Sequence, residues 1–160
     1  MVKDIHDLAQ LRKNGKSVKD YMECLEGKSG KEIIDNCELY EPKEDVIATL
    51  AEKAKGYTFV VFSAVWCKDC KSNVAAFAKI LEKQPGIDAL FFSGIKTAPL
   101  DPEIRWKVPP SPPEVDDFDL RKIPTFYILN SEGKVVGQMI ENPEHKETLE
   151  EELVYIIENL

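Results

Sequence analysis

Two cysteines separated by two residues are the side chains of this sequence best suited to chemistry. Cys67 and Cys70 follow the apolar run 58–62 and precede residues 71–83, whose apolar spacing is that of a helix. At a turn from strand to helix, the unpaired N–H groups of the first helical turn favour a thiolate at the first cysteine. A pair in this setting can cycle between a dithiol and a disulfide, so the spacing predicts a redox-active centre.

The two thiols are expected to have different roles. Cys67, at the helix start, is the expected nucleophile, which attacks a substrate disulfide and forms a mixed disulfide. Cys70 lies one turn further along, is expected to be better protected, and would release the reduced substrate by attacking Cys67.

Two alternatives remain open for this pair, namely half of a zinc site and two purely structural thiols. Structural zinc needs about four ligands, and the remaining cysteines and histidines offer no second pair with suitable spacing: Cys24, Cys37, His6 and His145. We therefore expect no metal. The two other cysteines are expected to be buried small residues, although a second disulfide or a relay of oxidation between the pairs stays open. Both histidines are expected at the surface.

A second segment supports the redox hypothesis. Ile123 and Pro124 stand at the start of the apolar run 125–129, which is followed by a glycine-containing turn and the strand-like run 134–140. This order predicts a proline that enters a β-hairpin. Together with Trp66–Cys70 and the lysine that follows, these motifs resemble the thioredoxin family over roughly residues 43–160.

The resemblance implies an α/β protein with the thioredoxin fold, a central mixed sheet flanked by helices. Residues 43–160 would form the thioredoxin-like domain, and residues 1–42 an N-terminal helical extension. It also implies a cis peptide bond before Pro124, which would pack against the cysteine pair. Residues beside the pair would then contact the substrate: Trp66, Lys68, Asp69, Ile123 and Pro124.

The sequence departs from the family's pattern at two places. Lys68 and Asp69 replace the Gly-Pro pair typical of thioredoxin itself. Lys68 is expected to favour the Cys67 thiolate and Asp69 to oppose it, although solvent screening limits both effects. A buried aspartate that in the family helps to deprotonate the second thiol is replaced by Val61, which predicts less efficient turnover.

Apolar periodicity predicts the remaining elements. Glycines at 27–31 are expected to break the helical pattern, and six prolines between residues 94 and 119 argue against a long helix there. Trp106, within that proline-rich segment, is a candidate partner contact. The expected helices are 17–25, 31–40, 44–55, 71–83 and 147–160, and the expected strands are 57–63, 87–92, 123–129 and 134–140.

Composition limits the partners and the compartment. The 160 residues suit one domain with a modest extension, and 43% hydrophobic with 31% charged residues exclude the disordered class. A net charge of -8 argues against nonspecific binding to nucleic acid or to anionic membranes. Because the sequence has neither a signal-peptide pattern nor an apolar run of the ~20 residues that a membrane span needs, we expect a cytoplasmic protein, most simply a monomer.

These observations predict a thiol–disulfide oxidoreductase that reduces or exchanges protein disulfides through Cys67 and Cys70. The cysteine pair carries two electrons itself, so no bound cofactor is expected. The predicted partners are protein disulfides and an upstream reductase that the sequence does not identify. The alternative function is a redox-inert binding module that uses the groove beside Trp66 and Pro124. An oxidase or isomerase is a third possibility, which a cytoplasmic location disfavours.

Overall fold

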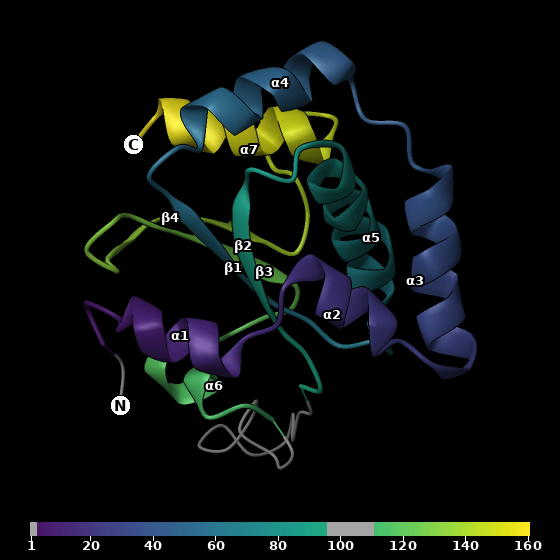
Figure 1. The fold of residues 1–160 in the computed structure, drawn as a ribbon, viewed down its shortest axis with the longest axis horizontal. Helices are drawn as coiled ribbons and strands as arrows, with labels where there is room; N and C mark the ends of the chain where they lie inside the picture. The colour runs from purple at the N-terminus through teal and green to yellow at the C-terminus, as the bar shows by residue number, and fades with distance from the viewer. Residues whose placement is uncertain (1–2, 96–110) are drawn as a thin grey trace.

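The computed structural model describes residues 3–95 and 111–160, and its centre is a mixed β-sheet (Figure 1). Within those residues the strand order is β2-β1-β3-β4. β1 pairs in parallel with β2 and antiparallel with β3, and β3 forms an antiparallel hairpin with β4. The strands are β1 (Thr58–Phe62), β2 (Asp88–Phe92), β3 (Thr125–Leu129) and β4 (Val135–Ile140). The expected α/β architecture with a mixed central sheet is confirmed.

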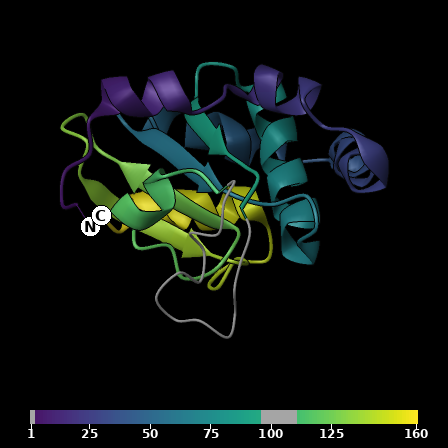
Figure 2. The ribbon, with the colours of Figure 1, turned by 90° about the horizontal axis from the view of Figure 1, so that it is seen from below.

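Helices surround this sheet in the described parts of the chain. α4 (Glu44–Lys53) and α7 (Leu149–Glu158) pack on each other, and α7 also contacts α5 (Lys68–Lys83) and β4. α3 (Gly27–Leu39) packs along α5 and lies farther from the sheet than α5 does (Figures 1 and 2). The short helices α1 (Leu8–Asn14) and α2 (Val18–Glu23) contact β2, and α6 (Glu114–Asp117) precedes the hairpin.

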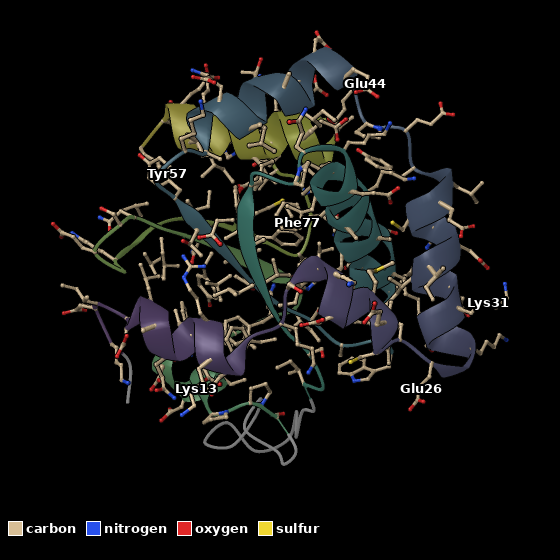
Figure 3. All side chains as sticks on the ribbon, in the orientation of Figure 1. Lys13, Glu26, Lys31, Glu44, Tyr57 and Phe77 are labelled. Atoms are coloured by element: carbon tan, nitrogen blue, oxygen red, sulfur yellow. The ribbon has the colours of Figure 1, made fainter. Side chains whose placement is uncertain are left out.

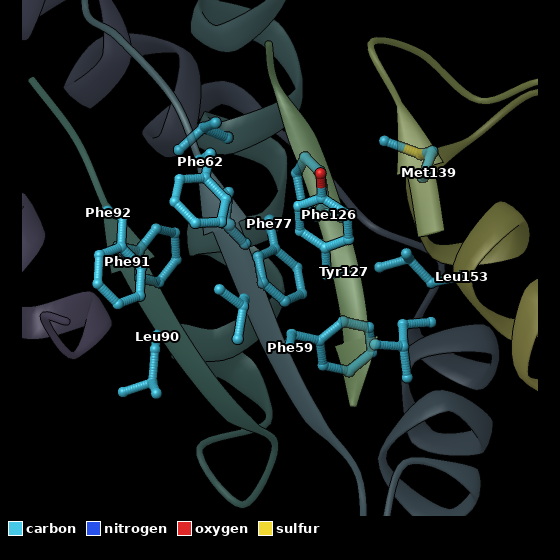
Figure 4. Close-up of a cluster of buried hydrophobic side chains, with 14 of the residues drawn as sticks. Phe59, Phe62, Phe77, Leu90, Phe91, Phe92, Phe126, Tyr127, Met139 and Leu153 are labelled. Carbon is cyan, nitrogen blue, oxygen red and sulfur yellow. The ribbon is translucent and has the colours of Figure 1, made fainter. Parts of the chain in front are cut away.

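Phenylalanines from the sheet and from α5 fill the main core (Figure 4). Every residue of β1 is buried, as a central strand covered on both faces requires. Phe77 of α5 makes edge-to-face contacts with Phe59 and Phe126, with ring centroids 5.3 and 5.2 Å apart. Charged side chains such as Lys31 and Glu44 point outward, whereas Phe77 lies inside (Figure 3). The packing of Phe77 fixes α5, the helix that follows Cys67, against the sheet.

The two short N-terminal helices, α1 and α2, join the same core. Leu11 of α1 and Tyr21 of α2 are both buried in it. Between these helices Lys16 exchanges two backbone hydrogen bonds with Phe91, of 2.9 and 2.8 Å, at the edge of β2. Arg12 also donates to both carboxylate oxygens of Asp88, at 2.8 and 2.6 Å. The N-terminal segment is therefore packed against the rest of the protein, with α1 and α2 on β2 and α3 on α5. The proposed boundary between residues 42 and 43 stays a prediction.

Several predicted boundaries differ from those in the structure. The glycine-containing segment 27–31 does not separate two elements, because α3 begins at Gly27, whose φ of 72° makes the turn into the helix. α5 begins three residues earlier than expected, at Lys68, and therefore includes Cys70. The sequence pattern did not predict α1. The prolines at 99, 102, 109 and 110 and the tryptophan at 106 lie outside the described residues.

His6 is buried, which corrects the expectation that it lies at the surface. Its side chain is 4% exposed and stacks on Phe118 with centroids 3.8 Å apart, and burial lowers the pKa of its imidazole. Its backbone N–H donates to the carbonyl of Gly133, in the turn between β3 and β4. A Cβ at Gly133 would lie 2.0 Å from the His6 carbonyl oxygen, so only glycine admits this approach. His145 is exposed, as expected.

No helix in residues 3–95 or 111–160 has the length and apolar character needed to cross a membrane.

Candidate active site

Cys67 occupies the N-cap position of α5. Its backbone is extended, with φ −84° and ψ 126°, and its Sγ accepts the backbone N–H of Cys70 at 3.4 Å. A cap side chain that accepts this N–H satisfies one of the donors left unpaired at a helix start. Cys67 is partly exposed, and its sulfur lies 3.7 Å from the carbonyl oxygen of Ile123. The Cys67 sulfur thus caps the start of α5 and accepts a backbone N–H group there, while the residue stays partly exposed.

This geometry lowers the pKa of the Cys67 thiol to about 6. The largest cause is a hydrogen bond from the Cys70 thiol to the Cys67 sulfur, and the backbone N–H groups of Cys70 and Asp69 add to it. Partial burial and the Asp69 carboxylate act in the opposite direction. Donors at a helix N-terminus favour a thiolate in this way because they stabilise the charged sulfur.

Alkylation of Cys67 by iodoacetamide is expected to reach half of its maximal rate near pH 6 and to level off above about pH 8. The sign follows from the lowered pKa, because the reactive thiolate forms as the pH rises through that value. The same cysteine in denaturant should titrate near the ordinary thiol pKa of about 8.5. The measurement is the alkylation rate at Cys67 as a function of pH, determined by peptide mass spectrometry. A midpoint in the folded protein close to that in denaturant would contradict the geometry.

Cys70 is fully buried one turn into α5. Its Sγ accepts the backbone N–H of Ala64 at 3.5 Å, from the segment that links β1 to α5. Burial is the main reason why the pKa of Cys70 is raised, and its hydrogen bond to Cys67 acts in the same direction. Both thiols are free. The arrangement therefore places a thiolate-forming sulfur in front of a protonated one.

Pro124 follows a cis peptide bond, as the resemblance implied. It is buried, and its carbonyl oxygen accepts the backbone N–H of Glu141 at 2.7 Å. Asn73 of α5 donates from its side chain to the carbonyl of Glu141 at 2.9 Å, so one residue links this segment to the helix of the cysteine pair. The predicted site residues of two distant segments therefore lie together: Cys67, Cys70, Ile123 and Pro124.

The other candidate substrate contacts, Trp66, Lys68 and Asp69, differ in how exposed they are. Trp66 is 51% exposed, and its indole N–H donates to the carbonyl of Ile95 at 3.1 Å, which fixes the ring beside the cysteines. Lys68 is exposed and Asp69 is half-buried. Whether these three residues contact a substrate stays a prediction.

The sequence did not reveal how α3 contacts the start of α5. Glu32 forms a 2.9 Å ion pair with Lys71, and Asn36 donates from its side chain to the Lys71 carbonyl at 3.0 Å. The ion pair lowers the pKa of Glu32. Because both side chains stay partly exposed to solvent, the contribution of this pair to stability is small. The contacts hold a helix of the N-terminal segment next to Cys70.

The remaining cysteines differ from each other. Cys37 is buried with Ile33, Ala75 and Ala78 in a small cluster between α3 and α5, as expected. Cys24 is exposed, which corrects the expectation of burial, because α2 ends beside it and leaves it at the surface. Both thiols are free. In the described parts of the chain, no three histidine, cysteine, aspartate or glutamate side chains form a group that could hold a metal ion.

A pocket of about 330 Å³ opens beside Trp66. Its walls come from α2 and the residues after it, from the β1–α5 connection and from the end of β2, and they include Tyr21, Cys24, Ala64, Trp66 and Ile95. The indole hydrogen bond to the Ile95 carbonyl joins two residues that line this pocket. The N-terminal segment thus forms one side of the surface next to the cysteine pair.

Comparisons with known proteins agree with this fold. Two solved structures resemble the chain: a Pseudomonas aeruginosa protein of unknown function, at 1.5 Å resolution, and an HIV epitope scaffold. The first has a TM-score of 0.62 at 18% identity, covering 89% of this chain and 81% of its own. The second has a TM-score of 0.66 at 18% identity, covering 97% and 99%. At this identity the likeness concerns the fold alone. No curated protein sequence matches the chain.

A family model described as Thioredoxin matches residues 15–94. The match begins before α2, contains both cysteines and ends after β2. It therefore covers half of the chain, including most of the N-terminal helices. By this match, together with the mixed sheet and the paired cysteines at the start of α5, the chain belongs to the thioredoxin-like family.

Proposed function

We propose that the protein is a thiol–disulfide oxidoreductase that reduces or exchanges protein disulfides through Cys67 and Cys70. The observation that carries the proposal is the contrast between the two sulfurs. Cys67 is partly exposed, accepts an N–H at the start of α5 and has a pKa lowered to about 6. Cys70 is buried, and its pKa is raised. A nucleophile and a protected second thiol need this difference.

The proposed reaction has two steps. The Cys67 thiolate attacks one sulfur of a substrate disulfide, forms a mixed disulfide and releases the other substrate sulfur as a thiolate, which takes up a proton. Cys70 then loses its proton and attacks the Cys67 sulfur. The second substrate sulfur leaves with the electron pair and is protonated. The substrate has gained two electrons and two protons, and Cys67 and Cys70 are joined in a disulfide.

The contacts around Cys67 support a substrate that approaches from the side of Ile123. The Ile123 carbonyl lies 3.7 Å from the Cys67 sulfur, at the point where the chain enters β3. The partly exposed Trp66 lies next to Cys67 in the sequence. A protein segment bearing a disulfide, rather than a bound cofactor, is the proposed reactant. The cycle then needs an upstream reductase, and a reducing compartment such as the cytoplasm suits it.

Reduction of insulin disulfides tests the proposal. The wild-type protein should accelerate the dithiothreitol-dependent reduction of insulin, and the acceleration should require both cysteines. An inactive wild-type protein that still binds unfolded or disulfide-containing polypeptides would favour the redox-inert binding module. In that case Trp66→Ala should weaken binding, whereas Cys67→Ser should not.

A further inference from the structure

A second pocket, of about 520 Å³, opens between α3, α5 and the connection from β4 to α7. Ser72 and Asn73 of α5 line it, together with Leu39 of α3 and with Asn142 and Glu147 of the connection. Its volume lies within the range typical of ligand pockets, about 300–1,000 Å³. It shares no lining residue with the pocket beside the indole ring, so the two pockets are separate.

Hydrogen bonds link this pocket to the cysteine site. Asn73 is 7% exposed, and its amide group donates to the carbonyl of Glu141 at 2.9 Å and to the side-chain oxygen of Asn142 at 2.8 Å. The N–H of Glu141 in turn donates to the carbonyl of Pro124 at 2.7 Å. The residue before that proline has its carbonyl oxygen 3.7 Å from the Cys67 sulfur. A short chain of contacts therefore runs from the pocket to the nucleophilic sulfur.

The distance from the sulfur to the pocket suits a polypeptide. Ser72 and Asn73 follow Cys67 by five and six residues. Because a helix rises about 1.5 Å per residue, the pocket begins about 8–9 Å along α5 from that cysteine. An extended polypeptide advances about 3.3 Å per residue. A substrate joined to Cys67 through its own cysteine would thus bring the third residue from that cysteine to the pocket, whereas a small disulfide would not reach it.

The side chains that line the pocket also suit a polypeptide. Three of them are amides, of Asn36, Asn73 and Asn142. An amide carries both donors and an acceptor, which match the C=O and N–H groups of a peptide backbone. Leu39 adds an apolar side chain that is 78% exposed. The charged residue among the described lining residues is Glu147, so the pocket has no basic group with which to bind an anion.

Two buried glutamates of α7 hold the walls of the pocket. Glu150 accepts the O–H of Tyr40, at the end of α3. Glu152 accepts the backbone N–H groups of His145 and Lys146, in the connection from β4, at 2.7 and 2.9 Å. A buried carboxylate is costly unless it is hydrogen-bonded in this way. Walls that are fixed before binding lower the entropy cost of holding a ligand.

We propose that this pocket binds the polypeptide substrate next to its disulfide, with an apolar side chain about three residues from the reacting cysteine lying against Leu39. The inference rests on the proposed function and names a substrate class for it, an extended polypeptide segment that carries an apolar residue at this place. The asparagine side chains of the pocket hydrogen-bond to the backbone of the segment. α3, from the N-terminal segment, thereby takes part in substrate selection.

The test compares the symmetric disulfides of two heptapeptides. One has leucine three residues before and after its cysteine, and the other has serine at both places. The measurement is the second-order rate constant for oxidation of the reduced protein, in a Cys24→Ser background. We expect the leucine peptide to react about tenfold faster, as partial burial of a leucine side chain predicts. Leu39→Ala removes the apolar contact and Ser72→Phe fills the pocket, and each should reduce this preference to about twofold or less.

Two controls separate binding in the pocket from the reactivity of the thiol and from loss of the fold. The rate with 5,5′-dithiobis(2-nitrobenzoate), which is too short to reach the pocket, reports the reactivity of Cys67 by itself, and each peptide rate is divided by it. Leu160→Ala is the matched variant, because this leucine is 49% exposed and does not line the pocket. It should keep the preference for the leucine peptide. Leu39 and Ser72 are exposed, so the fold should persist in both test variants.

Equal rates with the two peptides in the wild type would overturn the inference, and so would a preference that persists in Leu39→Ala or in Ser72→Phe. A preference lost in Trp66→Ala but kept in Leu39→Ala would place the leucine in the other pocket and would overturn it as well. The proposed function fails by a different result. One equivalent of 5,5′-dithiobis(2-nitrobenzoate) would then release a single thionitrobenzoate from the wild-type protein, because Cys70 would not resolve the mixed disulfide at Cys67.

Discussion

Cys67→Ser is expected to abolish disulfide reduction, with residual turnover of insulin no greater than that of dithiothreitol alone. The serine hydroxyl can still cap α5, because it accepts the N–H groups that Cys67 accepts. The fold should therefore persist, and only the nucleophile is lost. The measurement is the rate of insulin reduction, with Cys24→Ser as the matched control. Cys24 is an exposed free thiol outside the cysteine pair, so its replacement should leave the rate unchanged.

Cys70→Ser is expected to stop the reaction after one attack. Cys67 can still form the mixed disulfide, but no buried thiol remains to resolve it. The variant should therefore accumulate covalent complexes with substrate, visible on non-reducing gels and released by dithiothreitol. Peptide mapping should place the link at Cys67. Two results would reverse the assigned roles. One is that the Cys67→Ser variant, rather than Cys70→Ser, accumulates covalent complexes with substrate. The other is that iodoacetamide labels the reduced wild-type protein mainly at Cys70.

Local patterns were sufficient to predict the sheet and the cysteine pair. The apolar run of β1, the helical spacing of α5 and the two strands of the hairpin each carry their own periodicity. The order of the cysteine motif and Ile123–Pro124 along the chain was enough to predict the family, which the match over residues 15–94 confirms. These features depend on short stretches of sequence, and for that reason they could be predicted from the sequence alone.

The features that were missed depend on contacts between distant segments. His6 is buried because the turn at Gly133 and the ring of Phe118 lie over it, and nothing near residue 6 records this. Tyr21 lies within the expected helix 17–25, but its burial against Phe91 follows from how α2 packs on β2. Helical periodicity predicts this helix, but it does not predict the strand against which the helix packs.

Phe77→Ala is expected to lower the free energy of unfolding by about 3–5 kcal/mol. Phe77 is fully buried, and its ring contacts Phe59, Phe91 and Phe126 from three strands, at centroid distances of 5.3, 6.0 and 5.2 Å. Truncation removes the buried apolar surface and leaves a cavity that the rigid sheet cannot close. Because domains of this size are stable by only about 5–15 kcal/mol, the loss is a large share of the total.

Urea denaturation followed by circular dichroism measures this effect. Leu39→Ala is the control, since that side chain is 78% exposed and its removal should change stability by less than about 0.5 kcal/mol. A loss below about 1 kcal/mol in Phe77→Ala would show that α5 is not anchored by this ring. In the fraction of Phe77→Ala that stays folded, the alkylation midpoint of Cys67 should remain near pH 6, because N–H groups and the thiol in the first turn of α5 set the pKa. Stability and thiol reactivity should thus respond to different residues of the same helix.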